Sequence, residues 1–182
     1  MSFQNVREAE TIVALLMDLR RKSNRLHGNE LWFSICRIRV ITFYRAQVEL
    51  ISILLRTYGL HQIEISSVDS SQGSEADLII VSFVRTGGIN GVGFLSDVRR
   101  LNVALTRAKY KLICVGNSTS LLQGDGINTT TIKSLIQNAI DREVVVSTYA
   151  PKFHPNHMSQ KKRSNSQHYK GNQPPKRHRR GR

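Results

Sequence analysis

Residues 78–84 read LIIVSFV, a run of strand length that is apolar apart from one serine. Such a run is typical of a parallel strand covered on both faces, because a strand with one wet face alternates apolar and polar residues. Parallel neighbours are joined by crossover connections, which are usually helices. This segment therefore favours folds in which helices and strands alternate around a mostly parallel sheet.

The rest of the chain shows this alternation. Apolar residues at spacings of three and four predict helices, and short β-branched runs predict strands. The predicted helices are residues 7–22, 45–56, 95–110 and 132–142, and the other predicted strands are residues 38–43, 63–68, 112–116 and 144–146. We therefore predict an α/β fold, with an open, mostly parallel sheet, helices on both faces, and ligands beyond the carboxyl ends of the strands.

The composition changes at residue 151. Residues 151–182 contain all four prolines, 10 of the 27 Lys and Arg, none of the 13 Asp and Glu, and no Leu, Ile or Val. We predict a folded domain over residues 1–150 and a disordered basic tail over residues 151–182. An acid-free basic tail favours a polyanionic partner, most simply nucleic acid, and its cluster KRHRR also suits a nuclear-import signal.

Several classes of function are disfavoured. Two cysteines, Cys36 and Cys114, are too few for a disulfide framework or a four-ligand zinc site, so we predict no metal site. No run of 18 apolar residues and no apolar leader occur, so neither a membrane span nor a signal peptide is predicted. We expect an intracellular protein of the nucleus or cytoplasm, the tail favouring the nucleus.

Three clusters of polar and basic residues could carry the chemistry. Arg45 begins a predicted helix, where the helix dipole disfavours a cation unless an anion binds there. The loop 69–77 (DSSQGSEAD) is rich in hydrogen-bonding groups and includes Gly73. Arg100 and Arg107 are expected on one stripe of the helix 95–110, in a stretch without acidic residues. Phosphate binding would explain each of the three clusters. Each also has a plain structural explanation: a solvated arginine at Arg45, an ordinary turn at residues 69–77, and a solvated helix face at residues 95–110.

Taken together, the segments ITFYRAQVELI, SSVDSSQGSEADLIIVSFVR and GFLSDVRRLNVALTRAKYKLICVGN resemble motifs IV, V and VI of superfamily 1 helicases. The resemblance is nearest to the nonsense-mediated-decay and senataxin-like branch, and it spans about residues 5–120. It implies a RecA-like P-loop NTPase fold, specifically the second of the two such domains that share one ATP site.

The resemblance also implies roles for single residues. Arg45 resembles the motif IV arginine that reaches the γ-phosphate, and Arg107 resembles the motif VI arginine finger, so these two are the expected catalytic residues. Nucleotide-proximal positions and nucleic-acid-backbone positions follow from motifs V and VI. The nucleotide-proximal positions are Gln72, Gly73, Glu75 and Arg100. The positions near the nucleic-acid backbone are Ser66, Ser67 and Asp69. Phe43 stands where the family usually has proline.

A phosphate-binding loop of the form G-x-x-x-x-G-K-[ST] is absent from this sequence, because Gly-Lys never occurs. ATP with Mg is therefore expected only in a complete site that includes a first RecA-like domain, supplied in cis or in trans. We expect the C-terminal half of an ATP-dependent RNA or DNA helicase, inactive as an isolated chain. Two alternatives are a non-enzymatic nucleic-acid-binding helicase remnant and a protein-interaction module.

Overall fold

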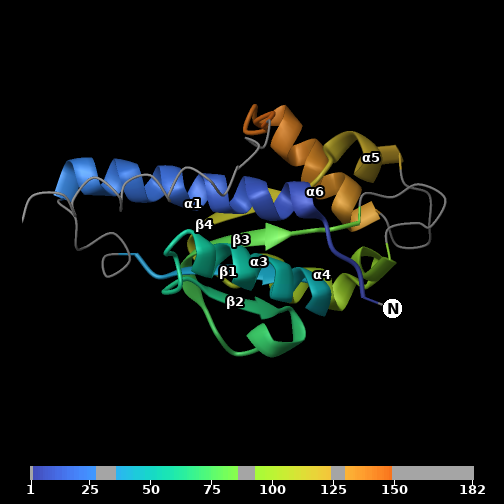
Figure 1. Ribbon diagram of the computed structural model, residues 1–182. Coiled ribbons are helices and arrows are strands. Elements are labelled where there is room, and N and C mark those ends of the chain that lie inside the picture. Colours follow the sequence, from blue (N-terminus) through green and yellow to red (C-terminus); the bar gives the residue numbers. More distant parts are fainter. Residues whose placement is uncertain (1, 28–35, 86–92, 124–129, 149–182) are drawn as a thin grey trace, which may run out of the picture. The chain divides into compact units, whose positions relative to one another are not determined.

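The structure is a computed structural model that describes residues 2–27, 36–85, 93–123 and 130–148, all of which belong to the compact unit Met1–Pro151 (Figure 1). The predicted tail, and residues 86–92 of the glycine-rich segment, lie outside the described residues. None of the described helices is long and apolar enough to cross a membrane.

Four strands form one sheet in the order β2-β1-β3-β4, and every neighbouring pair is parallel. This confirms the predicted α/β class. The strands are β1 (Ile38–Thr42), β2 (Glu64–Ser67), β3 (Ala76–Ser82) and β4 (Ala108–Val115). The helices are α1 (Val6–His27), α3 (Arg45–Thr57), α4 (Val98–Leu105), α5 (Ser118–Gln123) and α6 (Thr130–Asp141), with short 3-10 turns η1 (Asp69–Ser71) and η2 (Gly93–Ser96).

The alternation of side chains along the strands divides the core between the two faces of the sheet. One cluster joins Ile38 and Val40 of β1 with the apolar stripes of α1 and α3. The other joins Ile41 with buried residues of α4, α5 and α6. Helices therefore cover both faces of the sheet. This agrees with the burial of β3, in which all residues but one are buried.

The boundary between α4 and β4 was predicted wrongly. The helix predicted for residues 95–110 ends at Leu105, and residues 108–111 instead begin β4, which pairs with β3 from Ala76↔Ala108 onward. Pairing with a buried neighbour outweighs a local helical pattern that continues by coincidence. The strand predicted for residues 144–146 is also wrong: these three valines lie in irregular backbone and are exposed. The short helix α5 was not predicted.

Candidate nucleotide and nucleic-acid interface

The parallel sheet has two edges at which loops gather, and the predicted site residues divide between them. We call the edge where the strands end the carboxyl edge and the edge where they begin the amino edge. Thr42 is in register with Ser67 and with Ser82, so three strands end together. β3 has seven residues, and at about 3.3 Å per residue its ends lie about 20 Å apart.

The amino edge brings Glu75 and Arg107 together. Each residue immediately precedes a strand, and the backbone N–H of Ala76 donates to the carbonyl of Arg107 over 3.1 Å. The β3–β4 pairing thus places a carboxylate-bearing residue and a guanidinium-bearing residue beside one another, although 32 positions separate them in the sequence.

Among the described residues, the Arg107 side chain makes only local hydrogen bonds to neutral groups. Its Nε donates to the Val103 carbonyl over 3.1 Å, and its Nη2 donates to the Thr106 hydroxyl over 3.4 Å. Within the part of the chain that the structure describes, no carboxylate lies at ion-pair distance from this guanidinium. The predicted common stripe of Arg100 and Arg107 does not form, since Arg107 lies past the end of α4.

The loop before Glu75 is a tight turn with an open outer side. Ser71 is fully buried, and its hydroxyl donates to the Val68 carbonyl over 2.7 Å. Gly73 adopts φ = +78°, and a β-carbon built on it would meet no atom within 4 Å. A backbone conformation that favours glycine, together with free space above it, allows a ligand to approach the main chain closely. Gln72 and Glu75 are exposed beside it.

The carboxyl edge holds an ion pair between Asp69 and Arg100. Arg100 Nε donates to Asp69 Oδ1 over 2.9 Å, and Nη2 donates to Oδ2, so the pair is bidentate. The hydrogen bond from Arg100 holds the pKa of the Asp69 carboxyl below its usual value, and the same bond raises the pKa of Arg100. Both groups therefore stay ionised at neutral pH, and part of the donor capacity of Arg100 is engaged within the domain.

The two predicted serines end β2 at the same edge. The hydroxyls of Ser67 and Ser70 lie 3.0 Å apart, and the Ser67 hydroxyl also accepts from the Ser70 N–H over 3.2 Å. The Ser66 hydroxyl is buried and has no hydrogen-bond partner among the described residues.

Arg45 is the first residue of α3 and also lies at the carboxyl edge. Its side chain is 89% exposed, and Nε lies 3.3 Å from Glu49 Oε1. The preceding Tyr44 is buried and occupies the N-cap position of the helix, where its side chain does not cap the backbone N–H groups of α3. The structure therefore brings Arg45 near neither Glu75 nor Arg107, and the two arginines expected to act on one phosphate lie at opposite edges.

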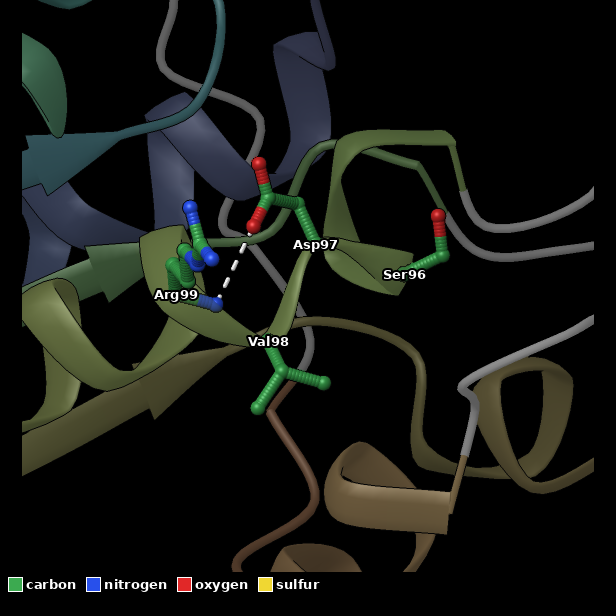
Figure 2. A pocket seen from close by; sticks show the side chains of 4 residues that line it. All are labelled: Ser96, Asp97, Val98 and Arg99. Carbon is green, nitrogen blue, oxygen red and sulfur yellow. Dashed lines mark hydrogen bonds between the residues drawn. The ribbon is translucent and has the colours of Figure 1, made fainter.

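A shallow depression at the start of α4 is lined by residues 96–99 (Figure 2). Asp97 caps this helix, because its Oδ1 accepts from the backbone N–H groups of Arg99 at 3.0 Å and Arg100 at 3.3 Å. The carboxylate thus occupies the helix N-terminus that could otherwise receive a phosphate. Elsewhere in the described ranges, no group of three His, Cys, Asp or Glu side chains could hold a metal ion.

A buried polar network beneath the carboxyl edge was not predicted. Glu8 of α1 accepts through Oε2 from the Ser82 hydroxyl at 2.7 Å and from the Val84 N–H at 2.9 Å. Gln47 is fully buried, and its amide nitrogen donates to the Ser82 hydroxyl over 3.1 Å. Val84 has φ = +69°, which is strained for a β-branched residue. The sequence does not single out Glu8, which stands close to Arg7 and Glu10 at the start of the predicted helix.

Comparisons with known proteins match most of the chain to helicases. A model of the family described as AAA domain matches residues 1–119. Regulator of nonsense transcripts 1 of Caenorhabditis elegans is 42% identical over 130 residues, which cover 68% of this chain and 11% of that protein. Helicase sen1 of Schizosaccharomyces pombe is 37% identical over 153 residues, covering 82% of this chain and 8% of that protein.

A third relative, DNA polymerase alpha-associated DNA helicase A of Schizosaccharomyces pombe, is 41% identical over 107 residues, covering 59% of this chain and 16% of that protein. The chain thus spans between 8% and 16% of the length of these three relatives.

Proposed function

Because the chain belongs to the AAA domain family and is a C-terminal helicase domain of the nonsense-mediated-decay and senataxin branch, we propose that it supplies one half of a shared ATP site. The other half is a first RecA-like domain, in cis or in trans, that holds the phosphates and the metal. Together the two domains drive movement along RNA or DNA.

The juxtaposition of Arg107 with the loop that carries Gly73 and Glu75 carries this proposal. Arg107 offers a planar guanidinium that no carboxylate within the described residues neutralises. Such a group stabilises negative charge that develops on a transferred phosphoryl group. The Glu75 carboxylate accepts from ribose hydroxyls, and the open main chain at Gly73 leaves room for the sugar.

The residues of the amino edge fit the sugar and the terminal phosphate of ATP, and they do not fit the metal. A magnesium ion needs oxygen ligands in octahedral geometry, and the described residues provide no acidic cluster for it. Mg and the phosphate-binding loop therefore belong to the first domain. Arg107 stabilises charge on the phosphoryl group, and Glu75 orients the ribose. Gln72 lies in the same loop as Glu75 and is a further nucleotide contact.

We assign the carboxyl edge to the nucleic-acid backbone. Ser67 offers a hydroxyl, and Arg45 offers an exposed cation. The Ser66 hydroxyl is buried and does not reach the surface, so the predicted role of Ser66 is not part of this assignment. Phosphate contacts of this kind position a strand without reading its sequence. Asp69 would act indirectly, since its carboxylate is paired with Arg100 and keeps that guanidinium in place. The assignment of Arg45 rests on its position at the opposite edge from Arg107.

The test is a chimera in which this chain replaces the matched segment of the Schizosaccharomyces pombe helicase sen1. We expect ATP hydrolysis that nucleic acid stimulates. Arg107→Ala should lower kcat by about 10³-fold or more with little change in KM, as expected for an arginine finger. Arg107→Lys should not restore it, because a point charge does not reproduce the planar fork.

Arg21→Ala is the matched control, because Arg21 pairs with Asp18 at the surface of α1, and α1 packs on the sheet face opposite α4. It should leave kcat within twofold. The 182-residue chain by itself should hydrolyse no ATP above background. A chimera whose Arg107→Ala variant retains more than a tenth of the turnover would refute the assignment.

A further inference from the structure

An arginine lies buried in the sheet directly beneath the loop of the amino edge. Arg39 is the second residue of β1, and its side chain is only 10% exposed. Its neighbours Ile38 and Val40 face α1 and α3, so by alternation Arg39 faces the opposite side, where the segment between β2 and β3 crosses. A buried guanidinium is rare unless its donors are paired.

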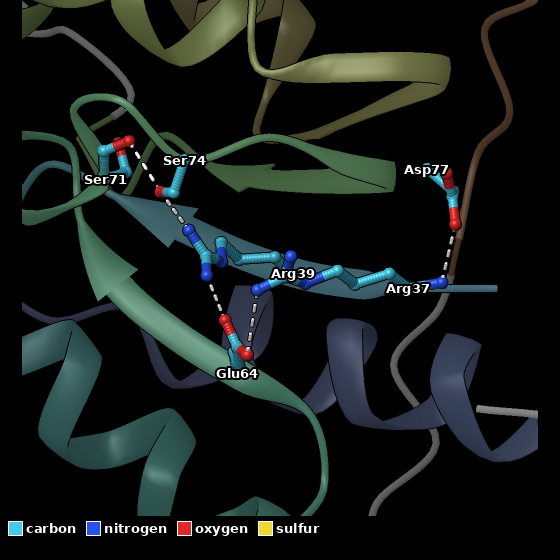
Figure 3. A network of polar contacts seen from close by, with 6 residues as sticks. All are labelled: Arg37, Arg39, Glu64, Ser71, Ser74 and Asp77. Carbon is cyan, nitrogen blue, oxygen red and sulfur yellow. Dashed lines mark hydrogen bonds and ion pairs between the residues drawn. The ribbon is translucent and has the colours of Figure 1, made fainter. Parts of the chain in front are cut away.

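The guanidinium joins three segments of the chain (Figure 3). Nη1 donates to the Ser74 hydroxyl, and Nη2 donates to a carboxylate oxygen of Glu64 on β2. The Ser74 hydroxyl in turn donates to the Ser71 carbonyl over 2.7 Å, and the Ser74 N–H donates to the same carbonyl over 3.1 Å. A continuous chain of hydrogen bonds therefore runs from the β1–β2 pair into the loop.

This arrangement is poorly explained as a device for stability. Arg39 Nε is buried and has no hydrogen-bond partner among the described residues. Glu64 is 51% exposed, so its pairing with Arg39 is screened by water. Removing a guanidinium from water costs free energy that such a pair does not fully return. The specific result of burying Arg39 is the fixed position of Ser74.

Ser74 lies between the two groups that we assign to the nucleotide sugar. Gly73 precedes it with open space above, and Glu75 follows it with an exposed side chain. On the far side of Gly73, the loop is held by the buried Ser71. The hydroxyl of Ser74 is thus the second anchor of a turn whose outer residues pack against little.

We propose that Arg39 is a positioning residue for nucleotide binding, which acts through Ser74 to hold Gly73 and the Glu75 carboxylate in place for the ribose of a nucleoside triphosphate. This inference rests on the proposed function, since it takes the amino edge as the nucleotide site. Arg39 touches no part of the nucleotide itself. Its loss should weaken ground-state sugar contacts by loosening the loop.

The first experiment measures amide hydrogen exchange by NMR in the 182-residue chain. Arg39→Met preserves apolar volume and removes the donors, and it should speed exchange of the residue 74 amide at least tenfold. Ser74→Ala should do the same from the other end of the contact. Arg37→Met is the matched control, because Arg37 also pairs with Glu64, at 3.4 Å, but its side chain is 60% exposed and makes no hydrogen bond to the loop.

The second experiment uses the sen1 chimera, which includes the first domain, and measures its Kd for ATP and for 2′,3′-dideoxy-ATP. We expect the unsubstituted chimera to prefer ATP. Arg39→Met should raise the Kd for ATP about tenfold and abolish the preference for the ribose hydroxyls, which a merely structural change would not do selectively. Arg39→Met combined with Ser74→Ala should be no worse than either alone, since both remove one contact.

The outcomes separate the two proposals. If the unsubstituted chimera binds ATP and 2′,3′-dideoxy-ATP equally well, the sugar site at residues 73–75 is wrong, and the positioning role falls with it. If it binds ATP with a ribose preference that Arg39→Met leaves intact, only the positioning role is overturned. Exchange at residue 74 that stays within twofold in both Arg39→Met and Ser74→Ala overturns it as well, even if one variant is less stable.

Discussion

Replacing Glu8 with alanine tests the buried network that supports the carboxyl edge. The Glu8 carboxylate is the acceptor for the Ser82 hydroxyl and the strained Val84 backbone N–H, and Oε1 accepts from Asn5 over 3.1 Å. Glu8→Ala leaves the first two donors buried without an acceptor. Each buried unsatisfied donor costs about 1–3 kcal/mol.

The loss is partly offset, because Glu8→Ala also removes the cost of burying a carboxylate. We therefore expect the free energy of unfolding to fall by about 2–4 kcal/mol, a large part of the 5–15 kcal/mol typical of a domain. Glu8→Gln keeps one acceptor oxygen and should cost about 1 kcal/mol. Glu10→Ala, at a half-exposed position two residues along α1, should stay within about 0.5 kcal/mol.

The same network predicts a dependence on pH. Burial raises the pKa of the Glu8 carboxyl above its ordinary value of 4.5, against the opposing effect of its hydrogen bonds. The folded state thus keeps a proton to higher pH than the unfolded state does. The contribution of Glu8 to stability is therefore greatest below about pH 4.5, and it is lost as pH rises through the raised folded pKa.

The assay is urea unfolding, followed by circular dichroism, of the unsubstituted chain, Glu8→Gln, Glu8→Ala and Glu10→Ala at several pH values. The stability difference between the unsubstituted chain and Glu8→Gln should shrink as pH rises from 4.5. A Glu8→Ala variant as stable as the Glu10→Ala control would refute the reasoning. A stability difference that grows with pH would show that the pKa of Glu8 is lowered instead.

Two further predictions concern the remaining charges. Because Arg100 lowers the pKa of the Asp69 carboxyl below 3.8, the stability that this pair contributes should be present above that pH and lost as pH falls through the lower folded pKa. Asp69→Asn should thus cost less than about 1 kcal/mol at pH 7, given the exposure of Asp69. This cost should shrink as the pH falls below 3.8, and urea midpoints measured from pH 7 downward check it. Deleting residues 151–182 should flatten the plot of log affinity for single-stranded RNA against log salt, because the tail carries 10 Lys and Arg and no acid. A salt slope that is unchanged by the deletion would show that the tail adds no phosphate contacts to those of the folded domain.

The sheet was predictable because its signal is local. An apolar run such as residues 78–84 identifies a strand buried on both faces, whatever surrounds it, and the stripes of α1 and α3 are equally visible. The end of α4 was not predictable in this way. Helical spacing continues through Ala108, and only the ladder to Ala76 turns that residue into the start of β4.

The same distinction between local sequence and tertiary structure applies to the candidate site. The sequence by itself determined which residue types are available to the proposed site, a guanidinium at Arg107 and a carboxylate at Glu75. Which of them meet was decided by the register of parallel strands. That register joins Glu75 to Arg107 at one edge and leaves Arg45 about 20 Å away at the other.

The supporting residues Glu8 and Arg39 were decided by tertiary structure alone. In the sequence, Glu8 stands close to the charged residues Arg7 and Glu10, and Arg39 alternates with apolar residues of a strand. Both patterns also describe solvated charges. The importance of Glu8 and Arg39 arises because other segments bring partners to them: Ser82 and Val84 from the end of β3, and Ser74 from the loop before it. A hydrogen bond between residues 35 to 76 positions apart leaves no periodic trace, since only chain folding sets the distance between them.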